Sequence, residues 1–126
     1  MRYVVPAMLV VVAVIHLLPL SGVLGAGRLS ALYGVPIDEP NLEILMRHRA
    51  VLFGLLGAFL LYAAFHPELH KLALIAGFVS VLAFLYLAWS VGGYNSQVGR
   101  VVTADLVALA CLVIGAAGYG WTSRGP

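Results

Sequence analysis

Apolar residues gather in four long runs along the chain, and polar or glycine- and proline-bearing stretches separate them. Each run holds about 20 residues, which is the number a helix needs to cross a hydrocarbon core of about 30 Å. The runs lack the alternation of barrel strands, so helices are the elements that satisfy the backbone in lipid. The pattern predicts an all-α integral membrane protein with helices at residues 3–24, 40–65, 70–92 and 97–120.

The connections between the runs predict how the helices are arranged. The last three runs are joined by short links, so neighbours are expected to be antiparallel, in one up-down four-transmembrane-helix bundle over residues 1–126. The link 25–39 is longer, and we expect it to lie on the membrane surface or to fold back over the mouth of the bundle. Asp38 or Glu39 is placed to cap the helix that begins at Pro40, where a missing amide costs nothing.

Composition supports a membrane protein. Hydrophobic residues make up 63% of the chain and charged residues 10%, with a mean hydropathy of +1.04. The net charge of +2 is scattered, so nucleic acid is not an expected partner. The first run is longer than the roughly 7–15 apolar residues of a signal peptide, so we interpret it as a retained span.

Loop charges predict the orientation. The side that holds both chain ends, hereafter the termini side, carries Arg2, Lys71 and Arg124. The opposite side, hereafter the link side, has Arg28 in its long link. By the positive-inside rule, the termini are expected in the cytoplasm, with the protein in a bacterial inner membrane.

Three runs carry an ionisable residue at a similar depth. Counted from the link side, Arg47, Asp105 and His16 lie roughly 10–13 Å inside, at about 1.5 Å per helical residue. Ionisable residues inside a membrane are costly and often mark function. We therefore predict a polar cluster that opens to the link side. The expected ligand-binding residues are His16, Arg47, His48, Tyr94, Asn95, Arg100 and Asp105.

The second run also predicts which way its arginines face. Spacings of three and four place Arg47 on one face with Glu43 and with small residues that allow close helix packing. We expect Arg47 to point into the bundle and to form structural ion pairs with Asp105 and Glu43. Arg49 shares a face with Phe53, and we expect it to face lipid and to extend toward the link side.

Several functions are compatible with such a cluster. The leading expectation is a non-catalytic binding or accessory protein that holds an amphipathic, lipid- or quinone-like ligand or a membrane partner. An alternative is an isomerase-like enzyme for an isoprenoid- or sterol-like substrate, with His16 and Asp105 moving protons in an apolar cavity below the polar layer. A small transporter is a further alternative. A network that only fixes helix register stays open as well.

The motifs point to no cofactor. No glycine-rich phosphate loop, nucleophile elbow or paired cysteines occur in the sequence. His16, His48 and Asp105 would make a two-histidine, one-carboxylate metal set, but they come from separate places without a spacing motif, so we predict no metal. The expected partners are membrane lipid, a lipid- or quinone-like molecule, and a second copy or a larger membrane complex.

One stretch resembles a known group of proteins. The segment Arg28-Leu-Ser-Ala-Leu-Tyr-Gly34, a link with Pro, Asp and Glu, and the run that begins Leu45-Met-Arg-His-Arg follow one another. This order is similar to small bacterial four-helix membrane proteins of the DoxX-like group, in its uncharacterised branches. The resemblance implies a four-helix inner-membrane protein with Arg47 at the motif position. It supplies no settled reaction, and the single Cys111 does not fit the thiol-redox assemblies of some members.

Overall fold

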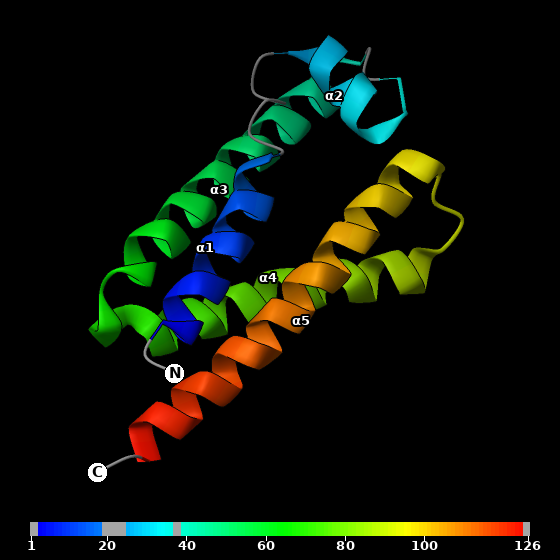
Figure 1. Ribbon diagram of the computed structural model, residues 1–126. Helices are drawn as coiled ribbons and strands as arrows, with labels where there is room; N and C mark the ends of the chain where they lie inside the picture. Colours follow the sequence, from blue (N-terminus) through cyan, green and yellow to red (C-terminus); the bar gives the residue numbers. More distant parts are fainter. Residues whose placement is uncertain (1–2, 19–24, 37–38, 125–126) are drawn as a thin grey trace.

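All regular structure in the described part of the chain is helical. The computed structural model describes residues 3–18, 25–36 and 39–124. The elements, shown in Figure 1, are α1 (Val4–Leu17), α2 (Ala26–Tyr33), α3 (Pro40–Ala64), the short 3-10 turn η2 (Pro67–Leu69), α4 (His70–Val91) and α5 (Ser96–Arg124). The end expected for the first helix, residue 24, and the candidate cap Asp38 lie outside the described residues.

Three of the helices are long and apolar enough to cross a membrane. They span Pro40–Ala64, Pro67–Val91 and Ser96–Trp121, with 25, 25 and 26 residues. At about 1.5 Å per residue each is longer than a hydrocarbon core of about 30 Å. The all-α class and a multi-pass membrane protein are therefore confirmed. The apolar helix α1 has 14 described residues, so its own crossing stays a prediction.

The beginning of α3 follows from local chemistry. The Glu39 carboxylate accepts hydrogen bonds from the backbone amides of Asn41 (3.1 Å) and Leu42 (2.9 Å), and Pro40 opens the helix. These two bonds, the first of them the stronger influence, hold the pKa of the Glu39 carboxyl below its usual value. The negative charge also suits the positive end of the helix dipole. Of the two candidate caps, Glu39 fills this role.

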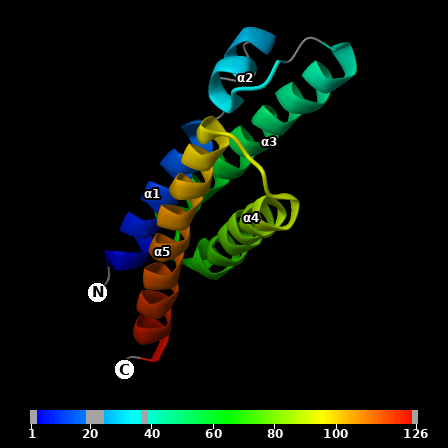
Figure 2. The ribbon, with the colours of Figure 1, turned by 90° about the vertical axis from the view of Figure 1, so that its right-hand side faces the viewer.

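The helix α1 separates α3 from α5. It packs against both, whereas α3 and α5 do not pack against each other within the described residues. A Cβ at Gly57 of α3 would stand 2.8 Å from the Cγ atom of Leu17 and 3.2 Å from the carbonyl oxygen of Ala13. Such close approach of small residues is what holds helices together in lipid. Helix α4 packs mainly on α5 and inclines away from α3, as Figure 2 shows.

The helix α2 folds back over the link side of the molecule. It contacts α3 and α5, and Figure 1 shows it beside their link-side ends. The ring of Tyr33 packs with Met46 of α3 and with Val98 and Val101 of α5, so it joins two helices that do not otherwise meet. In the described part of the long link, α2 therefore lies against the link-side ends of α3 and α5.

Candidate functional site

A cavity of about 270 Å³ lies at the C-terminal end of α1, between α3 and α5. All five α-helices or their end residues contribute to its wall. The lining residues are Ile15, His16, Leu18, Ala31, Tyr33, Arg49, Phe53, Phe84, Gln97, Arg100, Val101, Ala104 and Asp105. The cavity exists because α1 holds α3 and α5 apart, and among the described residues the Tyr33 ring packs against both helices nearer the link side.

His16 lies on the wall of this cavity with both ring nitrogens engaged. Its Nδ1 is 2.9 Å from the carbonyl oxygen of Val12, which can only accept, so Nδ1 carries the proton. In the neutral ring, Nε2 then accepts a hydrogen bond from the Ser80 hydroxyl of α4, also at 2.9 Å. The ring also lies against Phe53, with 5.7 Å between centroids. His16 therefore links α1 to α4, and it offers the cavity the edge of a ring whose polar atoms are occupied.

We expect Ser80→Ala to destabilise the protein by about 1–3 kcal/mol. The reason is that Nε2 of a buried histidine would lose its hydrogen-bond donor. Ser90→Ala on the same helix is the matched control, because Ser90 is exposed, and its effect should stay within about 0.5 kcal/mol. Unfolding by increasing fractions of SDS, followed by circular dichroism, measures both. Equal stability of the two variants would show that the His16–Ser80 bond contributes nothing.

Arg49 is the arginine of α3 that reaches the cavity. Its Nη1 donates a hydrogen bond of 2.6 Å to the Tyr33 hydroxyl. The guanidinium carbon lies 4.5 Å from the centroid of the Phe53 ring and 5.2 Å from that of Tyr33. Cation–π contacts of this kind contribute about 2 kcal/mol where water is excluded. The two rings and the hydroxyl thus hold a positive charge at the cavity wall.

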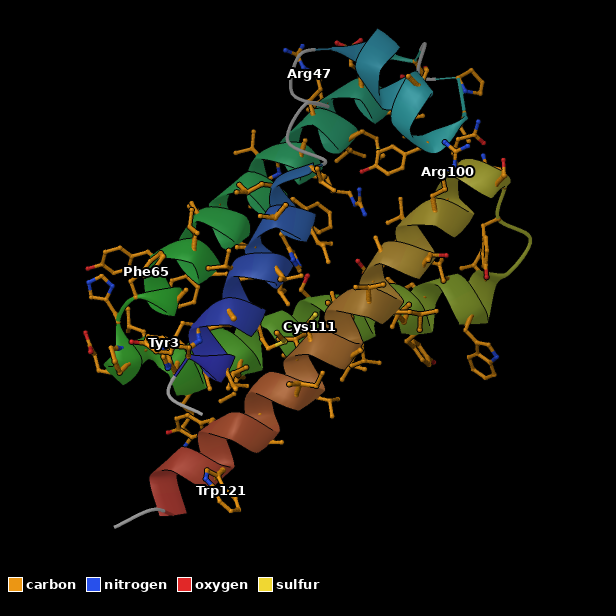
Figure 3. The ribbon with its side chains drawn as sticks, in the orientation of Figure 1. Tyr3, Arg47, Phe65, Arg100, Cys111 and Trp121 are labelled. Atoms are coloured by element: carbon orange, nitrogen blue, oxygen red, sulfur yellow. The ribbon has the colours of Figure 1, made fainter. Side chains whose placement is uncertain are left out.

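The expected facing of the two arginines is wrong. The Arg47 side chain is 45% exposed and pairs with Glu43 one turn earlier, with 3.3 Å between Nη1 and Oε2. Figure 3 shows it on the side of α3 away from α5. The predicted pairing of Arg47 with Asp105 is also wrong, because Arg47 pairs with Glu43 outside the cavity, and the arginine of α3 that lines the cavity with Asp105 is Arg49. His48, the next residue of α3, is exposed and does not line the cavity.

The cause of this error lies in the face of α3 that packs against the bundle. Its buried residues include Ala50, Gly54 and Gly57, as expected for the face that carries Arg47, but also Leu60, Ala63 and Ala64. Leu60 belongs to the face of Arg49, which we expected to meet lipid. At about 3.6 residues per turn these positions shift the centre of the buried face toward Arg49.

Asp105 faces inward from α5. It is 9% exposed and lies on a buried face with Ala108, Leu112 and Gly115. In the described part of the chain no donor reaches its carboxylate within hydrogen-bond distance, and no cation forms an ion pair with it within 4.0 Å. Asp105 and Arg49 therefore present opposite charges to one cavity without neutralising each other in direct contact. In lipid such an arrangement is costly unless a further group compensates it.

The other predicted site residues divide into two groups. Arg100 lines the cavity, and in Figure 3 it lies at the link-side end of α5, next to α2. Tyr94 is exposed and lies outside the lining. Asn95 is structural: its Oδ1 accepts from the Val98 amide (2.8 Å), and its Nδ2 donates to the carbonyls of Tyr33 (2.8 Å) and Gly34 (3.2 Å). It begins α5 and fastens the end of α2 to it.

Sequence reasoning missed several residues of the site. Tyr33 and Ala31 stand in the link, where no run of apolar residues indicates burial. Gln97 and Phe84 also line the cavity, and neither is among the expected ligand-binding residues. A signal existed for Ser80, which stands on a small-residue face near the middle of α4, at a depth comparable with that of His16. A buried histidine needs such a partner.

Geometrically, the described residues do not form a metal centre. Among them no three His, Cys, Asp or Glu residues come close enough to share an ion. The polar groups that remain at the cavity are two guanidiniums, a carboxylate, the Tyr33 hydroxyl and the Gln97 amide. This set can bind a small charged or dipolar group by hydrogen bonds and charge.

The comparisons with known proteins add no relative. No protein-family model, no curated protein and no solved structure matches this chain. The resemblance to the DoxX-like group is therefore not supported by a family match.

Proposed function

We propose that this protein binds the polar group of an amphipathic, lipid- or quinone-like molecule in the cavity beside α2, as a binding or accessory protein of the membrane. The observation that supports it most is the presence of Arg49 and Asp105 on the wall of one cavity in a membrane protein. Burying such groups in lipid costs free energy, and a bound polar group would recover part of it.

The size and lining of the cavity support a ligand with one polar end. Pockets that enclose whole drug-sized molecules measure about 300–1,000 Å³, whereas this one measures about 270 Å³. It suits the polar end of a molecule whose apolar part stays in lipid. Apolar walls from Ile15, Phe53 and Phe84 continue the surface that such a tail would follow.

The packing below His16 does not favour the enzyme alternative. An isomerase-like enzyme needs an apolar cavity on the termini side of the polar layer. There Leu9, Val12 and Ala13 of α1 are fully buried, and they share a core with Leu60 and Leu112. All residues that line the cavity come from the link side of that core, which does not favour a transport path either.

The orientation is part of the proposal. We propose that all four apolar helices lie in the bilayer, antiparallel to their neighbours, with both termini in the cytoplasm as the loop charges indicate. Tyr3 and Trp121 lie at the end of the molecule away from α2 (Figure 3). The cavity would then open in the half of the membrane that faces away from the cytoplasm.

We expect Arg49→Ala to lose the bound amphiphile while Arg47→Ala retains it. The two residues lie on the same helix, but only Arg49 lines the cavity. A hydrogen-bonded charge accounts for about a tenfold change in retention. Mass spectrometry of the intact, gently purified protein measures the bound small molecule in wild type and in both variants. The same bound molecules in the same amounts in all three proteins would contradict the proposed function.

A further inference from the structure

The charged groups at the cavity, Asp105 and the two arginines, require opposite chemical groups from a ligand. Asp105 is nine-tenths buried, and within the described residues its carboxylate receives no hydrogen bond. A carboxylate that is ionised accepts hydrogen bonds and donates none, so a ligand that compensates it must supply an N–H or O–H donor, best of all a cationic one.

The arginines require a ligand group that accepts hydrogen bonds and carries negative charge. Arg49 has five N–H donors, one of which goes to the Tyr33 hydroxyl. Arg100 forms no hydrogen bond or ion pair with any other described residue, although it lines the same cavity. Guanidinium groups bind phosphate and carboxylate through paired N–H donors. The arginine part of the cavity is thus suited to an anion.

A ligand with a cationic donor for Asp105 and an anionic group for the arginines is a zwitterion. Building on the proposed function, we infer that the cavity takes the headgroup of a phospholipid with a protonated primary amine, its phosphate toward Arg49 and Arg100 and its ammonium toward Asp105. The Arg49 and Asp105 charges are not in direct contact, so a headgroup with separated charges can lie between them. The cavity of about 270 Å³ has room for such a headgroup, while the acyl chains stay in lipid.

Other headgroups satisfy only part of the site. A choline headgroup has no N–H donor for Asp105. A glycerol headgroup has the phosphate, and its hydroxyls can donate hydrogen bonds to Asp105, but it has no cation to neutralise the charge of the carboxylate. The two carbonyl oxygens of a quinone accept hydrogen bonds and, like choline, give Asp105 no donor.

The test is a competition between phospholipids that share the same two acyl chains, with a quinone as a further competitor. Full-length protein is exchanged into detergent that holds equimolar phosphatidylethanolamine, its N-methyl and N,N-dimethyl forms, phosphatidylcholine, phosphatidylglycerol and an isoprenoid benzoquinone. Mass spectrometry of the intact protein counts each bound species. We expect phosphatidylethanolamine to be retained about tenfold over phosphatidylcholine and phosphatidylglycerol. The N-methyl series should fall most at the last methylation, which removes the final N–H. This arm uses only the wild-type protein.

Variants separate the inference from the proposed function. Asp105→Asn should remove most of the preference for phosphatidylethanolamine over phosphatidylglycerol, and Glu43→Gln, which changes a carboxylate outside the cavity, should keep it. Preferred retention of phosphatidylglycerol or of the quinone, lost in Arg49→Ala, would overturn the inference and leave the proposed function standing. If the amount of bound lipid is the same for every headgroup, and the same in wild type and Arg49→Ala, the proposed function is overturned as well.

Discussion

Replacing Gly57 with leucine is expected to remove about 3 kcal/mol or more of the stability of the folded bundle. A Cβ at this position already falls within 2.9 Å of two side-chain carbons of Leu17 and 3.2 Å from a backbone oxygen of α1. The end of Leu17 has some freedom to turn away, but the Ala13 carbonyl belongs to a helix and has none. A full leucine would therefore force α1 away from α3. The gain of about 1 kcal/mol in helix propensity over glycine does not offset this.

Ala58→Leu is the matched control for Gly57→Leu. Ala58 is the next residue of the same helix and is exposed, so a leucine there meets lipid and its effect should stay within about 0.5 kcal/mol. Unfolding in SDS, followed by circular dichroism, compares the two variants with wild type. If Gly57→Leu were as stable as Ala58→Leu, the close contact of α1 with α3 would have no energetic role.

Asn95→Ala is expected to release α2 from the bundle, at a local cost of about 2–4 kcal/mol. The substitution removes the cap of α5, typically worth about 1 kcal/mol. It also removes the donor to the Tyr33 and Gly34 carbonyls, with about 0.5–1.5 kcal/mol for each hydrogen bond. A helix of eight residues is unstable by itself. Once released, α2 no longer holds the Tyr33 hydroxyl beside Arg49, so retention of the amphiphile should fall too.

Asn95→Asp distinguishes the two roles of this residue. The aspartate keeps an oxygen that accepts from the Val98 amide and loses the N–H donors that fasten α2. Hydrogen exchange read by mass spectrometry should therefore show faster exchange in α2 for both variants, and in the first turn of α5 for Asn95→Ala alone. Unchanged exchange of α2 in Asn95→Ala would show that other contacts hold α2 in place.

Much of the architecture could be predicted because it depends on local properties. The length of each apolar run, the proline and acid at the start of α3, and the glycines between runs each act within a few residues. The inward face of α5 could be predicted for a similar reason. Asp105 falls in line with Ala108 and Gly115, and a charge in lipid is compensated only toward the interior of the bundle.

The facing of α3 could not be predicted with the same means. In water, the polar face of a helix marks its exposed side, but in lipid the exposed side is as apolar as the packed side. The second run has two apolar faces, one with Arg47 and one with Arg49, and small residues alone favoured the first. The burial of Leu60 in the core and the hydrogen bond between Tyr33 and Arg49 decided for the second.

The sequence by itself therefore determined a multi-pass helical membrane protein and the inward direction of Asp105. Hydrophobic length and the cost of a charge in lipid are properties of each segment. Only the tertiary structure decided which arginine shares the cavity with Asp105. It also decided that the Ser80 hydroxyl hydrogen-bonds the His16 ring and that the Tyr33 ring packs between α3 and α5. These are contacts between segments far apart in the chain, and their geometry depends on how α1 separates its neighbours.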